Sequence, residues 1–203
     1  MKKIQGFALL EALLALVLMM IAAGASYTLI KSFRANSSIQ QFIRYSTNIT
    51  QSFMPFVDGG AYSTVLSGNK LSQPFLTSIS IPSEDQRDCS NAYCYVSSGM
   101  YLDGGSAESN LSFGVQMDSA QELASYFMIA VNATGLQVNQ ILQTASTMFS
   151  VYCAESQGAN ISSITTPCVL QSSANNSTPY SLFLVFPKSG DAPPVGANLT
   201  PPS

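Results

Sequence analysis

The sequence predicts an α+β fold, in which one long N-terminal α-helix packs on an antiparallel β-sheet, with a second helix and disulfide-closed loops. Three observations lead to this expectation. An apolar run from Phe7 to Ile30 continues into a segment with helical spacing, and several later segments alternate between apolar and polar residues. The chain also contains four cysteines, an even number that suits disulfides in a translocated domain.

The first thirty residues combine a short basic start with an apolar run of membrane length. The run Phe7–Ile30 would span about 36 Å as a helix, enough to cross a hydrocarbon core of roughly 30 Å. Lys2 and Lys3 precede it, which favours a cytoplasmic N-terminus and translocation of the rest of the chain. The run holds one charge, Glu11, whose burial costs on the order of 2.5–3.5 kcal/mol near the bilayer centre.

The Glu11 carboxylate needs a positive partner, and the run contains no Lys, Arg or His. The partner must come from another chain or from an amine created by cutting the chain. The string from Gly6 to Glu11, after a basic leader and before an apolar helix, resembles the class III signal of type IV prepilins. The resemblance implies that a prepilin peptidase cleaves after Gly6 and that Phe7 becomes the N-methylated terminus. It also implies that Glu11 pairs with the terminal amine of a neighbouring subunit during assembly.

The same resemblance implies a structural subunit of a type IV pilus. Such a subunit is a homo-oligomer in a helical filament, handled by pilus assembly machinery in the inner membrane and then displayed on the bacterial surface. The fibre would serve adhesion, mating contact, aggregation or motility. A minor pilin or a pseudopilin of a type II secretion system is an alternative within the same machinery. An ordinary signal peptide cut after Ala25, or a plain membrane anchor, would instead make the chain a secreted or anchored binding module.

The helical pattern continues beyond the apolar run with a single apolar stripe, which indicates an amphipathic half that packs on a domain. Pro55 should end this helix at about Met54. The sequence therefore divides into a leader at residues 1–6, a helix at 7–54 (7–30 membrane or filament core, 31–54 amphipathic), a head at 55–192 and a flexible proline-rich tail at 193–203. The stripe consists of Ile39, Phe42, Ile43, Ile49, Phe53 and Phe56.

The head should contain short strands and one further helix. Residues 57–74 look loop-like because they hold glycine-containing turns, and residues 84–93 form a polar loop. The helical period at residues 135–149 predicts an amphipathic helix, and the order of strand, helix and late cysteines is similar to the C-terminal half of type IVb pilins. Alternation or apolar runs predict strands at residues 77–81, 95–102, 111–117, 126–131 and 181–186, with 111–117 and 126–131 pairing as a hairpin.

Composition excludes several functions. Charged residues make up only 9% of the chain, and the part from residue 51 onward holds three basic and ten acidic residues. Such an acidic head is a poor binder of phosphate backbones, so we expect no specific nucleic-acid binding. The chain has no histidine, which removes Ser-His and Cys-His nucleophilic pairs. We therefore expect no enzyme activity, no cofactor and no metal site.

The four cysteines fall into two local pairs by spacing, Cys89–Cys94 and Cys153–Cys168. Four cysteines allow three connectivities, of which local pairing is the preferred one. A single C-terminal disulfide is common in pilins of Gram-negative bacteria, and the resemblance implies that Cys153–Cys168 corresponds to it.

Overall fold

The computed structural model describes Met19 and residues 36–102, 108–117 and 124–202. The chain divides into two units, Met1–Ser37 and Ser38–Ser203, and the described part of the second is called the head below. The head combines helices with an eight-stranded antiparallel sheet and two disulfides, so the predicted mixture of α and β structure is confirmed. Across the described ranges, no helix has both the length and the apolar character needed to cross a membrane.

The strands follow the order β1-β2-β4-β5-β6-β8-β7 across the sheet, and β3 pairs with β4 off this path. Their bounds are β1 Leu66–Ser67, β2 Lys70–Ser72, β3 Gln86–Ser90, β4 Tyr93–Tyr101, β5 Glu108–Met117, β6 Ala124–Thr134, β7 Ser150–Ala154 and β8 Pro179–Phe186.

The N-terminal helix is described over residues 36–58. The other helices are α2 Gln73–Ser78 and α3 Gly135–Ala145, with 3-10 turns η1 Tyr62–Thr64, η2 Ser83–Asp85, η3 Ile161–Ser163 and η4 Ser173–Asn175.

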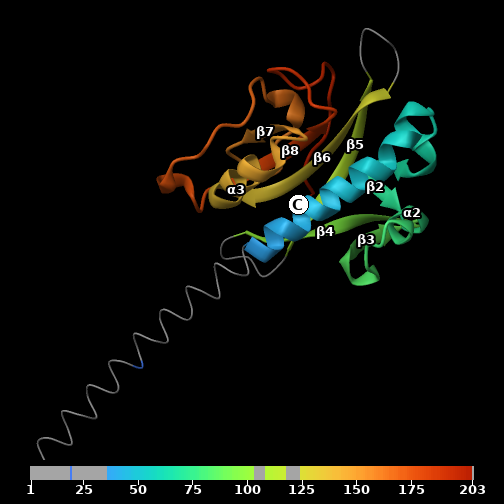
Figure 1. Cartoon of the computed structure of the whole chain (residues 1–203), viewed down its shortest axis with the longest axis horizontal. Coiled ribbons are helices and arrows are strands. Elements are labelled where there is room, and N and C mark those ends of the chain that lie inside the picture. The colour runs from blue at the N-terminus through green and yellow to red at the C-terminus, as the bar shows by residue number, and fades with distance from the viewer. Residues whose placement is uncertain (1–18, 20–35, 103–107, 118–123, 203) are drawn as a thin grey trace, which may run out of the picture. The chain divides into compact units, whose positions relative to one another are not determined.

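The larger core lies between one face of the sheet and the N-terminal helix. Figure 1 shows this helix, in blue to cyan, running across the strands. Phe53 is fully buried and stacks on Phe127 of β6 with ring centroids 4.5 Å apart, and it meets Phe75 edge-on at 6.0 Å. Val138 and Ile141 of α3 belong to the same buried cluster. The amphipathic stripe therefore packs on the sheet, as its spacing predicts.

The strands β6 and β8 are buried on both faces of the sheet. Ile129 and Leu184 belong to the core under the N-terminal helix, whereas Ala130 and Phe183 belong to a second cluster. Adjacent residues of a strand point to opposite faces, so both faces must be covered. This two-sided burial explains why both strands are continuous apolar runs in the sequence.

The second face is covered by the C-terminal strap, residues 193–202. Ala197 and Leu199 are buried in the second cluster, although the sequence predicts a flexible tail from residue 193. The strap is also fixed by hydrogen bonds: the Ser112 hydroxyl donates to the Thr200 carbonyl at 2.7 Å, and the Ile161 amide donates to the Leu199 carbonyl at 3.0 Å. The expectation of a flexible tail is therefore corrected, because one leucine and backbone carbonyls anchor the segment.

The N-terminal helix also ends later than the sequence predicts. It continues through Pro55 to residue 58, one turn beyond Met54. Proline removes one hydrogen bond to the preceding turn, but Pro55 is exposed, so water can satisfy the free carbonyl. The extra turn buries Val57 and places Phe56 against Phe75 at 5.9 Å, which offsets this loss.

The predicted strand at residues 77–81 is wrong, because the helix α2 occupies Gln73–Ser78. Pro74 lies in its first turn, where the missing amide hydrogen costs nothing. Phe75 and Leu76 are neighbours in sequence and both enter the same core, which a helix permits and a strand does not. The loop predicted at residues 57–74 likewise contains η1, β1 and β2, and the polar loop at 84–93 contains the exposed strand β3.

The remaining predicted elements are confirmed, with shifted ends. The strands predicted at 95–102, 111–117, 126–131 and 181–186 correspond to β4, β5, β6 and β8, and β5 and β6 pair as a hairpin. The helix α3 starts where predicted but ends at Ala145. Its start carries a capping box, in which the Thr134 hydroxyl accepts from the Gln137 amide while the Gln137 side chain accepts from the Thr134 amide.

Candidate functional site

The residues that carry the functional prediction lie at the N-terminus. Gly6, Phe7 and Glu11 fall outside the residues that the structure describes, as does the run Phe7–Ile30 apart from Met19, a helical residue with an exposed side chain. What the structure adds is the head that this N-terminal segment would carry.

Both local cysteine pairs are disulfides in the structure. Cys89 and Cys94 join β3 to β4 with Cα atoms 4.1 Å apart, and Cys153 and Cys168 close a longer loop with Cα atoms 5.1 Å apart. The longer loop returns to the edge strand β7, because the Cys168 amide donates to the Val151 carbonyl at 2.8 Å. This return covers part of the β7 edge, which would otherwise be open to pairing with another chain.

A polar contact fixes the N-terminal helix to the loop before β3. The Tyr45 hydroxyl donates to the Asp85 carboxylate at 2.6 Å, and the Gln41 amide donates to the same oxygen at 3.4 Å. Burial, together with the hydrogen bond to Asp85, raises the pKa of Tyr45 above its usual value. No sequence signal links Tyr45 to Asp85, 40 positions away, so this contact could not be predicted.

A second polar cluster lies at the start of β5, around Glu108. Its carboxylate accepts hydrogen bonds from the Ser97 and Tyr101 hydroxyls and forms an ion pair with Arg87 at 3.3 Å. The pKa of Glu108 lies below its usual value, mainly because the Ser97 hydroxyl donates to the carboxylate. Burial opposes this shift, and the contacts with Tyr101 and Arg87 add to it. Glu108 is therefore a permanent anion at neutral pH.

Glu108 borders a groove of about 610 Å³ on the sheet face that the C-terminal strap covers in part. One wall is the strap at Thr200, Pro201 and Pro202, and the loop at Gln157 also lines the groove. The groove lies beside the strap and is also lined by Glu108, Ser109 and Asn110 of β5. Sequence reasoning missed it, because its walls are brought together from distant parts of the chain.

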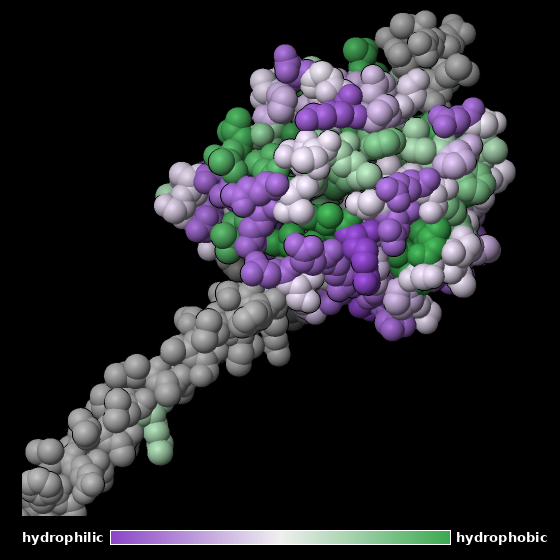
Figure 2. Space-filling model, viewed as in Figure 1, coloured by the Kyte–Doolittle hydropathy of each residue, from purple (hydrophilic) through white to green (hydrophobic). Residues whose placement is uncertain are grey.

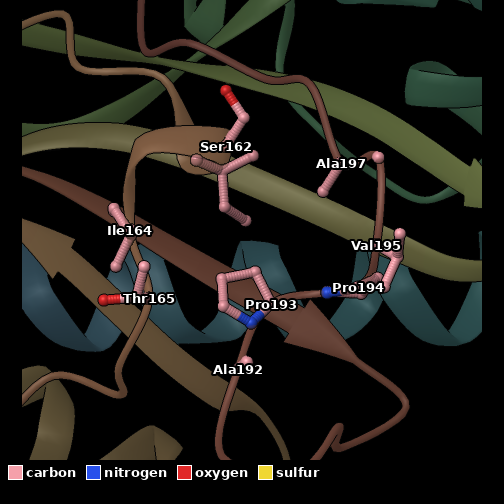
Figure 3. Close-up of a pocket in the computed structure, with 10 residues that line it drawn as sticks. Ser162, Ile164, Thr165, Ala192, Pro193, Pro194, Val195 and Ala197 are labelled. Carbon is pink, nitrogen blue, oxygen red and sulfur yellow. The ribbon is translucent and has the colours of Figure 1, made fainter.

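A smaller hollow of about 230 Å³ lies between the strap and the loop around η3. Figure 3 shows Pro193 on one side, facing Ile164 and Thr165. The labelled residues carry no charge, and the Ser162 hydroxyl is already bonded to Asn160 at 3.0 Å. This hollow therefore offers neither catalytic groups nor a fixed set of donors.

The described surface presents no cluster suited to metal binding. Within the described residues, no three His, Cys, Asp or Glu side chains are grouped so that they could hold a metal ion. Figure 2 shows hydrophilic residues interspersed with apolar ones on the face in view. The large apolar side chains that are exposed belong to several different elements: Met19, Tyr101, Met117, Leu136, Val169, Leu170 and Val195.

Comparison with known proteins gives one match. Residues 1–27 match the family model of the prokaryotic N-terminal methylation motif. Neither the comparison with curated proteins nor that with solved structures gave a match. The class III prepilin signal that the string from Gly6 to Glu11 predicts is thereby confirmed, and the match supports a type IV pilin-like protein.

A pilin-like motif points to a structural protein rather than to an enzyme. It also implies processing by a prepilin peptidase, an N-terminal membrane anchor and later assembly at the surface. The head is compatible with this class, since it offers a helix packed on a sheet, two disulfides and polar surface clusters.

Proposed function

We propose that the chain is a structural subunit of a type IV pilus, which polymerises through its N-terminal helix into a helical surface fibre. The observation that carries this proposal is the methylation motif at residues 1–27, which contains Gly6, Phe7 and Glu11, the residues to which the proposal assigns processing and assembly. The fibre would act in adhesion, mating contact, aggregation or motility.

In this proposal the prepilin peptidase cleaves after Gly6 in the inner membrane and methylates the new terminus, Phe7. The Glu11 carboxylate then pairs with the Phe7 amine of an adjacent subunit. In a core of low dielectric the pair offsets the desolvation of both charges, and removing one partner leaves the other buried at a cost of about 3–5 kcal/mol. Removing the Glu11 charge should therefore impair assembly far more than it impairs membrane insertion.

The head supports this role through its attachment to the helix. In the proposed subunit, one helix from Phe7 to residue 58 has a filament-core half and a half that belongs to the head. The second half is held by Phe53 in the core and by the Tyr45–Asp85 hydrogen bond at 2.6 Å. The described part of the helix, residues 36–58, is thereby fixed to the head.

The test is fractionation of cells that produce wild-type protein, Glu11→Val or the control Leu10→Val. Glu11→Val makes the apolar run more apolar, so insertion and cleavage should persist while fibres in the sheared fraction fall to few or none. Leu10→Val introduces the same side chain one position away without removing a charge, and it should assemble as wild type does. Wild-type fibre levels in Glu11→Val would refute the assembly role.

Two further measurements separate the alternatives. The mass of the mature N-terminus should correspond to a methylated Phe7, whereas an ordinary signal peptidase cut would leave Ser26. If the chain is the main component of sheared fibres, it is a major subunit. If fibres form but contain it only in traces, it is a minor pilin, and its absence from any fibre would favour a pseudopilin.

A further inference from the structure

The groove beside the C-terminal strap contains hydrogen-bonding side chains that bind no other residue in the described part of the head. Asn110 of β5 lies two residues before Ser112, whose hydroxyl bonds the strap at Thr200. Side chains two apart on a strand point to the same face, so Asn110 faces the same side of the sheet as the strap. It also lines the groove of about 610 Å³, a size within the roughly 300–1,000 Å³ of small-molecule sites.

Three lining side chains can both donate and accept. The Asn110 amide, the Gln157 amide and the Thr200 hydroxyl have no hydrogen-bond partner among the described residues. Asn110 and Thr200 are half-buried, so a ligand in the groove would meet them away from bulk solvent. Groups of this kind match hydroxyl-rich ligands, whose oxygens also donate and accept.

One wall of the groove is already rigid. The Asn132 amide donates to the Pro202 carbonyl at 2.9 Å, and its oxygen accepts from the Gly158 amide at 3.3 Å. Asn132 is buried and joins the strap to the loop that carries Gln157. Thr200 and Gln157 are therefore presented on a frame that is held in place before a ligand arrives, which lowers the entropy cost of binding.

The charge of the groove limits the ligand further. Among the described residues that line the groove, Glu108 is the only one with an ionisable side chain, and it stays ionised at neutral pH because three side chains donate to it. An anion there would repel phosphate, sulfate or carboxylate groups. Three of the roughly four acceptor positions of the carboxylate are occupied, so about one remains for a ligand hydroxyl.

We propose that this groove is a binding site for a neutral carbohydrate. Hydroxyl groups of the sugar bind Asn110, Gln157 and Thr200, and the Pro201 and Leu102 side chains contact its carbon-bound hydrogens. The proposal goes beyond the subunit role and does not depend on it, because the groove belongs to the head of the single chain.

The test uses the purified full-length chain in a polyoxyethylene detergent, since sugar-based detergents would compete for the site. Binding is measured on immobilised neutral oligosaccharides ending in glucose, galactose, mannose or N-acetylglucosamine, and on their sialylated and sulfated counterparts. Wild type should bind at least one neutral group and bind its anionic counterparts more weakly. Asn110→Ala should weaken that binding about tenfold, the factor that one lost hydrogen bond represents.

Gln157→Ala provides a second variant that leaves the fold intact, because Gln157 is exposed on a loop and makes no hydrogen bond within the described residues. It should also weaken binding of the same sugar. Asn48→Ala, an exposed asparagine of the N-terminal helix, and Thr165→Ala, in the smaller hollow, should bind as wild type does. Three results would each overturn the proposal: no binding of any neutral sugar, a preference for anionic sugars, or binding by Asn110→Ala and Gln157→Ala that equals that of wild type.

Discussion

Truncation of Leu199 tests whether the C-terminal strap belongs to the folded head. The Leu199 side chain is 1% exposed and lies in a cluster with Met128, Ala130 and Phe183. Its approach to the sheet is close: a Cβ on Gly114 would stand only 3.3 Å from Leu199 Cδ1. Leu199→Ala would therefore leave a cavity that neighbouring side chains surround on several sides.

The expected loss follows from burial. A fully buried leucine truncated to alanine costs about 2–5 kcal/mol, and the lower half of this range applies where neighbours can collapse into the space. The strap lies at the surface of the head and can relax inward, so we expect about 2–3 kcal/mol for Leu199→Ala. Val195→Ala is the matched control, because Val195 belongs to the same strap and is 75% exposed. Its effect should stay within about 0.5 kcal/mol.

The assay is urea unfolding of the full-length chain in detergent, followed by near-ultraviolet circular dichroism. The chain has no tryptophan, so its tyrosines supply the signal. Tyr152 reports on the relevant face, because it is fully buried in the same cluster as Leu199. Its hydroxyl also lies 3.0 Å from the Gly190 carbonyl and 2.9 Å from the Ala192 carbonyl. With an unchanged slope, the shift in midpoint converts directly to a change in the free energy of unfolding.

A flexible tail would give a different result. If residues 193–202 were unpacked, Leu199→Ala and Val195→Ala would have the same midpoint as wild type. That outcome would refute the packed strap, and with it the wall of the groove that Thr200 and Pro201 form.

Three further predictions concern other parts of the chain. Cys168→Ser opens a disulfide with a sequence separation of 15 and should lower the free energy of unfolding by about 3 kcal/mol in the same assay. The lowered pKa of Glu108 contributes stability above its usual pKa of 4.5, and this contribution is lost as pH falls through the lower folded value. Glu108→Gln should therefore be less stable than wild type at pH 7, and the difference should shrink in acid; a constant difference in midpoints across pH would contradict this. Gly6→Val should block cleavage and leave a full-length product in the inner membrane, whereas a mature product of normal mass would exclude prepilin processing.

Several features of the fold could be predicted because they depend on neighbouring residues. The strand β6 and the helix α3 are visible as an apolar run and as a helical period. Local signals for two further details are also present: Thr134 and Gln137 have the spacing of a capping box, and Pro74 stands two residues after Ser72, the N-cap of α2. The alternating segment at residues 77–81 predicts a strand, whereas the proline near the start of α2 favours the helix that the structure shows.

The sequence by itself determined the prepilin signal within residues 1–27, since such a signal is a linear string and a lone charge in an apolar run is visible without a fold. It also determined the mixture of α and β structure, because hydrophobic periodicity is a local property. Only the tertiary structure decided that Leu199 is buried, since one leucine among prolines has no period to reveal which surface it covers. The same holds for the groove at Asn110, whose walls come from segments far apart in the chain and meet only in the folded head.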